Sequence, residues 1–118
     1  MRLGQSADLR RRFTAADLAE FAALSGGAPA SHVPEPLIAA LFSQLLGMHL
    51  PGRGTHYLKQ ELTFHAPAPV NAELAARVEI TRLRPDSQLV DLWASCSDPA
   101  GRLICEGRAL VQATEWKP

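Results

Sequence analysis

This sequence predicts an α+β fold in which an antiparallel sheet wraps around one buried central helix. Two observations support that expectation. The segment from Leu37 to Met48 is apolar on every side except at Ser43 and Gln44, and such a helix must be enclosed by other structure. The segments after it alternate between apolar and polar residues, which is typical of half-buried strands.

Length and composition restrict the class of protein. A chain of 118 residues is long enough for one hydrophobic core and too short for two. Its twelve basic and twelve acidic residues cancel, so we expect neither nucleic acid nor a membrane as a partner. The N-terminus lacks the apolar stretch of a signal peptide, and the apolar helix is shorter than the roughly 20 residues that span a bilayer. We therefore expect a cytoplasmic protein.

We expect three parts along the chain. Residues 1–12 form a flexible leader with a basic run at Arg10–Arg12, residues 13–114 form a single domain, and residues 115–118 form a tail. The basic run precedes the first helix signal, so we interpret it as part of a solvated segment.

The signals for the two helices are local. Thr14 and Asp17 have the spacing of a capping box, and Gly26 can supply the left-handed conformation that ends the first helix. Pro36 suits the first position of the central helix, because its missing N–H would have no partner there.

From Thr55 the apolar period changes to two. In the first expected strand Leu58, Leu62 and Phe64 share one face, and Gln60 is a polar exception that needs a hydrogen-bond partner if it is buried. Further strands follow, and a small sheet of this kind leaves edges exposed. Pairing of two copies would cover those edges, so we expect a homodimer.

The two cysteines fall on the arms of a hairpin closed by Asp98–Gly101. A four-residue turn would place Ser97 opposite Arg102 and Cys96 opposite Leu103, which makes Cys96 and Cys105 diagonal neighbours. We expect both to be reduced thiols in the core, because the sequence has no other cysteine and the expected setting is cytosolic. A metal site would need more ligands than this pair supplies.

Several segments, in order, resemble one known family. Phe13–Gly26, Leu41–Gly54, Tyr57–Phe64 and Pro69–Leu74 are similar to the corresponding segments of MaoC-like hydratases, the group that contains the R-specific enoyl-CoA hydratases. The resemblance runs from Phe13 to about Gln112. It implies the hot-dog fold, an acyl-CoA or acyl-carrier thioester as substrate, and hydration of a trans-2-enoyl thioester without a cofactor or a metal.

The resemblance also implies site residues. In the family an aspartate and a histidine activate one water, and Ser25–His32 corresponds to the loop that carries them. His32 falls on the histidine position, Gly27 falls on the aspartate position and Pro29 replaces an asparagine. The segment joining His32 to the central helix is shorter than in the family, and Glu35 stands at the helix entrance where the family has glycine.

These departures leave three functions open. Glu35 is a carboxylate at a helix N-terminus and can stand in for the aspartate, so the catalytic candidates are His32 and Glu35. Alternatively, hydratase activity is lost and Glu35 serves an acyl-CoA thioesterase, or the chain is a non-catalytic subunit that pairs with an active MaoC-like homologue.

Three further residues are candidates for binding the substrate. Arg53 lies between two glycines and can contact the phosphates of a CoA or carrier arm. His56 lies on the apolar parity of its strand near the helix exit, and Gln60 can hydrogen-bond a ligand amide.

Overall fold

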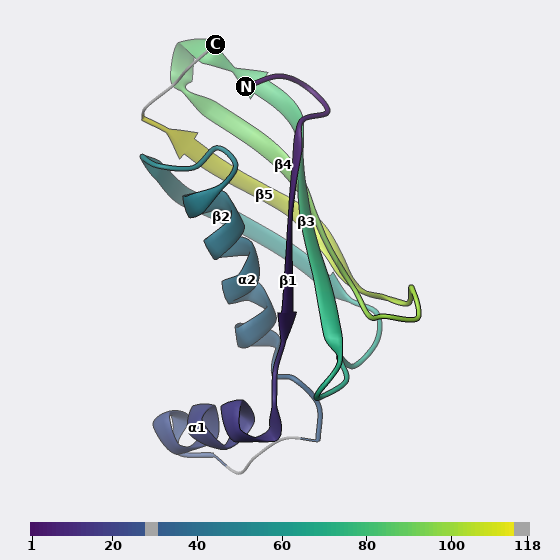
Figure 1. Ribbon diagram of the computed structural model, residues 1–118. Helices are drawn as coiled ribbons and strands as arrows, with labels where there is room; N and C mark the ends of the chain where they lie inside the picture. The colour runs from purple at the N-terminus through teal and green to yellow at the C-terminus, as the bar shows by residue number, and fades with distance from the viewer. Residues whose placement is uncertain (28–30, 115–118) are drawn as a thin grey trace.

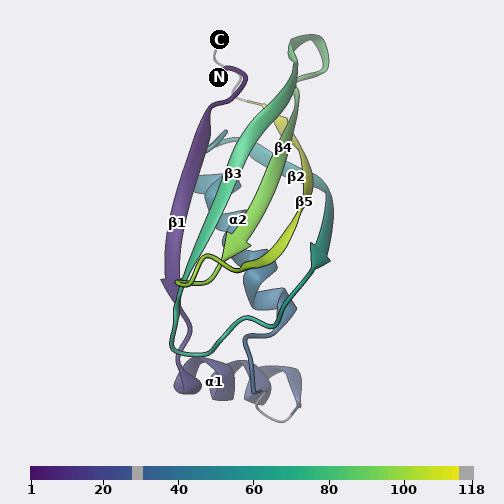
Figure 2. The same cartoon turned by 90° about the vertical axis from the view of Figure 1, so that its right-hand side faces the viewer.

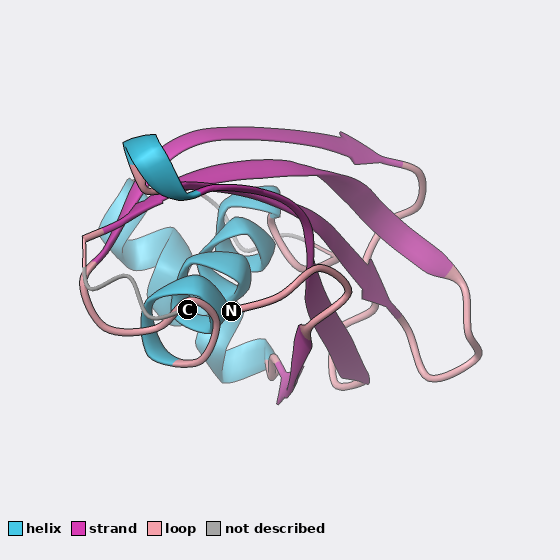
Figure 3. Ribbon diagram, turned by 90° about the horizontal axis from the view of Figure 1, so that it is seen from above, coloured by secondary structure: helices cyan, strands magenta, loops and turns pink. Residues whose placement is uncertain are grey.

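A five-stranded antiparallel sheet curves around one side of a long helix in the computed structural model, which describes residues 1–27 and 31–114 (Figure 1). The strand order is β1-β3-β4-β5-β2, so β1 and β2 are the edges of the sheet. Seen from above, the strands arch over the helices (Figure 3). The elements are β1 (Ser6–Arg12), α1 (Ala15–Ser25), α2 (Glu35–Met48), β2 (Thr55–Phe64), β3 (Glu73–Arg84), the short 3-10 helix η1 (Pro85–Ser87), β4 (Leu89–Ser97) and β5 (Leu103–Ala113). The expected α+β arrangement is confirmed.

The local signals for α1 behave as predicted. The Thr14 side chain accepts a hydrogen bond from the backbone N–H of Asp17, and the Asp17 carboxylate accepts one from the backbone N–H of Thr14. The helix ends at Gly26, whose φ of 79° lies in the left-handed region. Bonds to Thr14 lower the pKa of the Asp17 carboxyl. Figure 2 shows α1 lying across one end of the sheet.

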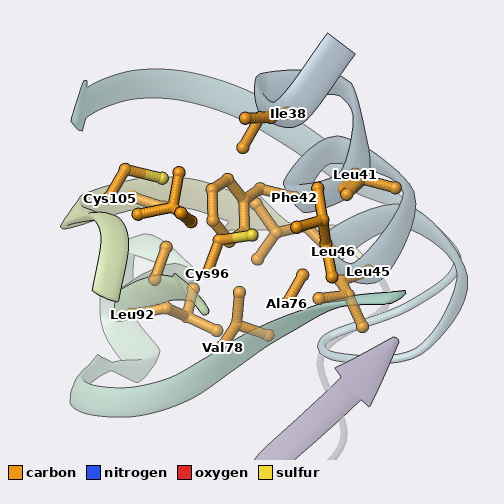
Figure 4. Close-up of a cluster of buried hydrophobic side chains, with 14 of the residues drawn as sticks. Ile38, Leu41, Phe42, Leu45, Leu46, Ala76, Val78, Leu92, Cys96 and Cys105 are labelled. Atoms are coloured by element: carbon orange, nitrogen blue, oxygen red, sulfur yellow. The ribbon is translucent and has the colours of Figure 1, made fainter. Parts of the chain in front are cut away.

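The central helix α2 buries one face rather than all sides. Its buried side chains meet the concave face of the sheet and form the core (Figure 4): Ile38, Leu41, Phe42, Leu45 and Leu46. The opposite face is exposed within one chain, and Met48 keeps 68% of its surface accessible. The expectation of full enclosure is therefore wrong for a single copy, because the sheet is too small to wrap past one side of the helix.

The expected flexible leader is wrong for Ser6–Arg12. This segment is β1, and it pairs with β3 in a register that sets Leu9 opposite Ala76. Ala7 and Leu9 are half-buried and alternate with exposed charged residues, a period-two pattern. The basic run is anchored rather than free, since Arg10 Nη1 lies 3.0 Å from Glu73 Oε1.

A β-bulge changes the predicted faces of β2. The register with β5 shifts between Tyr57 and Lys59, so Leu58 is 53% exposed instead of facing the core. Tyr57 takes the inward place, while Leu62 and Phe64 remain half-buried against the core as expected. His56, expected on the apolar parity, is exposed. A bulge inserts one residue and reverses the parity on one side of it, which alternation alone does not reveal.

The hairpin register also differs from the prediction. Ser97 pairs with Leu103, and Cys96 pairs directly with Cys105, so the cysteines are cross-strand partners rather than diagonal neighbours. The connecting loop has one residue more than the expected turn, and the register shifts next to Cys96. Both cysteines are buried free thiols, as expected, and burial raises the pKa of Cys96 to about 11 and of Cys105 to about 12.

A buried carboxylate ties three strands together on the side of the sheet away from α2. Asp91 of β4 is only 4% exposed and accepts hydrogen bonds from Arg84 of β3 and Arg108 of β5, the latter with Nε at 2.8 Å from Oδ1. Burial alone would raise the pKa of Asp91, but the bonds to both guanidinium groups outweigh it and hold the pKa below its ordinary 3.8. Nothing in the alternation of β4 marks this residue in advance.

We predict that Asp91→Asn lowers the free energy of unfolding by about 2 kcal/mol at pH 7, because two arginines lose their shared charge partner. The carboxyl has a lowered pKa in the folded state, so its contribution is fully present above the unfolded pKa. It is lost as the pH falls through the folded pKa. Urea unfolding at several pH values measures the difference.

Asp86→Asn is the matched control, since Asp86 is an exposed aspartate of η1. It should leave stability unchanged within about 0.5 kcal/mol. If the difference in the free energy of unfolding between the wild type and Asp91→Asn stayed constant down to pH 2, the role assigned to the ionised carboxylate would be refuted.

Alanine substitution at two glycines, Gly107 and Gly47, should change the stability of the protein in opposite directions. A Cβ at this position in β5 would lie 1.7 Å from the backbone oxygen of Glu61 in β2, so Gly107→Ala should cost more than about 3 kcal/mol or prevent folding. Gly47 is the control, because it lies in α2 with open space around its missing Cβ. Gly47→Ala should raise stability by about 0.5–1 kcal/mol. Thermal unfolding of both variants tests this. Equal changes in stability in Gly107→Ala and Gly47→Ala would contradict the close approach of β2 and β5.

Candidate functional site

The loop that enters α2 is fixed by one buried residue. Val33 is 1% exposed and forms an isolated antiparallel bridge with Ala68, in which Val33 N donates to Ala68 O at 2.9 Å. The helix then begins at Glu35, so Pro36 is its second residue and not its first as expected. Because Val33 is anchored, the flanking residues His32 and Glu35 are held next to the segment that follows β2.

His32 and Glu35 line the same cavity. Its volume is about 290 Å³, and it lies between the start of α2 and the segment from Phe64 to Ala68. Ile38 and Phe64 form apolar walls, and His65 adds a third polar group. A small cavity with apolar walls and a few polar groups suits a short acyl chain with a reactive polar end.

The charges around this cavity are arranged by the fold. The Glu35 carboxylate lies at the positive end of the α2 dipole, because Glu35 is the first residue of the helix. The pKa of Cys105, raised chiefly by burial, is raised further by the charges of Cys96, Glu35 and Glu106. His65 Nε2 lies 3.0 Å from Glu106 Oε2, so this histidine is paired with a carboxylate although its side chain is partly exposed.

Backbone donors at the helix entrance are few. Val33 N and Leu37 N already donate to carbonyl oxygens, and Pro36 has no N–H. Among the backbone N–H groups of residues 33–37, all of which the structure describes, that of Glu35 alone has no hydrogen-bond partner in the described residues. A carbonyl oxygen that develops negative charge near Glu35 would therefore meet this donor.

A second hollow continues from the cavity along the groove between α2 and β2. It has a volume of about 280 Å³ and shares Glu35 and Phe64 with the cavity. Its other walls are Pro36, Ala39, Gln60 and Leu62. Gln60 Nε2 is buried without a hydrogen-bond partner in residues 1–27 and 31–114, as is Tyr57 Oη. Burial raises the pKa of Tyr57 to about 12, against the opposing effect of the Gln60 side chain. The expected need of Gln60 for a partner is thus unmet within one chain.

Two predicted substrate contacts lie elsewhere in the chain. Arg53 and His56 follow the C-terminal end of α2, and a helix of 14 residues is roughly 20 Å long, so neither lines the cavity at its N-terminal end. Gly27 is exposed at the end of α1. Pro29 lies outside the described residues.

Two further classes of site are not found. No group of three or more His, Cys, Asp or Glu side chains in residues 1–27 and 31–114 is arranged to hold a metal ion. Across those same residues, neither helix has the length and apolar character needed to cross a membrane.

Comparison with known proteins identifies relatives along nearly the whole chain, although no protein-family model matches it. The (R)-specific enoyl-CoA hydratase of Aeromonas caviae is 38% identical to this chain over 127 residues, and the alignment covers 95% of both chains. The (R)-specific enoyl-CoA hydratase of Rhodospirillum rubrum is 33% identical, and the alignment covers 92% of this chain and 85% of the relative. The solved structure of an (R)-hydratase from A. caviae superposes with a TM-score of 0.89, covering 95% of this chain and 96% of that one. R-hydratase PhaJ1 of Pseudomonas aeruginosa gives a TM-score of 0.82 at 27% identity, covering 96% and 82%. The chain has the hot-dog fold and belongs to the (R)-specific enoyl-CoA hydratase family of MaoC-like proteins.

Proposed function

We propose that this chain binds an acyl thioester and catalyses the reversible hydration of a trans-2-enoyl thioester, with Glu35 as the base and His32 as the group that orients the water. The observation that supports this most is that His32 and Glu35 line one cavity at the start of α2. The relatives named above are hydratases. Glu35 supplies a carboxylate to the cavity that His32 lines, in place of the aspartate whose position in the family Gly27 is expected to occupy.

The proposed reaction adds water across the C2–C3 double bond. Glu35 accepts a proton from water while the water oxygen bonds to C3, and the proton is then delivered to C2, so that Glu35 ends as it began. His32 donates a hydrogen bond to the water oxygen. Negative charge develops on the thioester carbonyl oxygen, which the N–H of Glu35 and the α2 dipole stabilise. Gln60 Nε2, a buried donor in the adjoining groove, binds a polar group of the substrate.

The same carboxylate supports a second candidate, an acyl-CoA thioesterase. A glutamate that activates water can direct it at the carbonyl carbon instead of C3, which releases a free thiol. A third candidate is a non-catalytic subunit, which would follow if Gly27 has removed an essential base. In that case the chain pairs with an active MaoC-like homologue and shapes its acyl pocket.

The hydratase proposal predicts that purified protein consumes a short trans-2-enoyl-CoA, seen as loss of the conjugated thioester absorbance. His32→Ala and Glu35→Gln should each lower kcat/KM by about 100-fold or more, because each removes a group that acts on the water. Glu20→Gln is the control for charge, since Glu20 is an exposed glutamate of α1, and it should retain full activity.

Full hydration by Glu35→Gln would remove Glu35 from the mechanism. Release of thiol from a saturated acyl-CoA, without hydration of the enoyl-CoA, would establish the thioesterase instead. Absence of both activities, together with copurification of a longer MaoC-like chain, would establish the non-catalytic subunit.

We also propose that the chain is a homodimer. β2 is an edge strand of the sheet, and two large apolar residues are exposed nearby, Leu58 on β2 itself and Met48 on α2. A second copy seated on β2 and the open face of α2 covers all of these groups. Light scattering coupled to gel filtration should give twice the mass of the chain, and Leu58→Asp should shift it towards the monomer. A wild-type monomer at micromolar concentration would contradict this.

A further inference from the structure

A third hollow adjoins the cavity that His32 and Glu35 line. Its volume is about 370 Å³, and it shares His32, Pro67 and Ala68 with that cavity. Its outer wall is the loop between β4 and β5, which contributes Asp98 and Arg102. A molecule whose acyl end fills the cavity can therefore leave past His32 and continue into this hollow.

The loop holds the backbone of Arg102 in place. Asp98 N donates to Arg102 O at 3.0 Å, and Arg102 N donates to Asp98 Oδ1 at 2.9 Å. Ala100 N donates to the same carboxylate oxygen at 3.0 Å, and Gly101 N donates to Asp98 O at 3.0 Å. Gly101 has a φ of 84°, the left-handed conformation that this turn requires. The Asp98 carboxylate thus accepts backbone N–H groups and is not paired with the Arg102 side chain.

The Arg102 guanidinium is an uncompensated cation at this position. In the described parts of the chain it has no hydrogen-bond or ion-pair partner, whereas Arg10, Arg77, Arg84 and Arg108 are all paired with carboxylates. A fixed backbone with a free planar guanidinium suits bidentate recognition of an oxyanion, and phosphate is the oxyanion for which arginine is best suited.

We infer that Arg102 binds a phosphate of the arm that carries the acyl thioester, with the arm running past His32 along Pro67 and Ala68. This inference rests on the proposed function, because it takes the cavity at His32 and Glu35 as the place of the acyl group. Both sources of such an arm, CoA and the phosphopantetheine of a carrier protein, carry phosphate. The role was expected of Arg53, which lies at the other end of α2.

Binding of CoA, 4′-phosphopantetheine and pantetheine, measured by titration calorimetry, tests the inference without requiring activity. Arg102→Gln should weaken CoA binding by about fivefold and leave pantetheine, which has no phosphate, unchanged. Raising the salt concentration should weaken CoA binding to the wild type more than to this variant. Arg82→Gln is the matched control and should bind all three ligands like the wild type. Arg82 is exposed, has no ion-pair partner among residues 1–27 and 31–114, and lies near the turn that joins β3 and β4.

Each outcome has a defined meaning. If Arg102→Gln binds both CoA and 4′-phosphopantetheine more weakly than the wild type does, Arg102 contacts the phosphate that CoA and carrier proteins share. If its affinity falls for CoA alone, Arg102 contacts the nucleotide phosphates. Equal CoA binding by Arg102→Gln and the wild type overturns the inference and leaves the proposed function standing. A wild type that binds none of the three ligands overturns both. An unchanged circular dichroism spectrum establishes that Arg102→Gln is folded.

Discussion

Burial of the apolar face of α2 against the concave side of the sheet is the interaction on which the rest of the structure depends. Phe42 and Leu45 have no exposed surface, and their partners Val78 and Leu92 on the sheet are equally buried (Figure 4). Each such side chain contributes about 1.5–3 kcal/mol by leaving water. Because this packing fixes the position of α2 on the sheet, it also fixes where in space the first residue of the helix lies.

The position of the candidate site depends on where α2 begins. Glu35 is the first residue of α2, and the bridge between Val33 and Ala68 ties the preceding loop to the segment that follows β2. Because we expect Gly27 to stand at the position of the family's catalytic aspartate, the proposed function takes its carboxylate from the helix entrance. A glutamate carboxylate at this place suits a base that activates water and equally suits a group that directs water at a carbonyl carbon.

Sequence reasoning succeeded where the signal is local and failed where it depends on register. The capping box of Thr14 and Asp17 could be read from neighbouring residues, and the short spacing of His32 and Glu35 in the sequence agrees with their lining one cavity. The bulge at Leu58 and the direct pairing of Cys96 with Cys105 could not, because one inserted residue reverses a face without altering the composition. Asp91 was missed for a related reason, since its arginine partners come from two other strands. β1 was missed because its charged residues hid the alternation of Ala7 and Leu9.

We propose that an acyl thioester places its acyl group in the cavity that His32 and Glu35 line at the entrance of α2. A crystal structure with a non-hydrolysable thioether analogue of an enoyl-CoA would show where the acyl group binds. We expect density for the acyl group against Ile38 and Phe64, with the thioether sulfur near the Glu35 N–H. Acyl density at the other end of α2, beside Arg53 and His56 of the same chain, would contradict it.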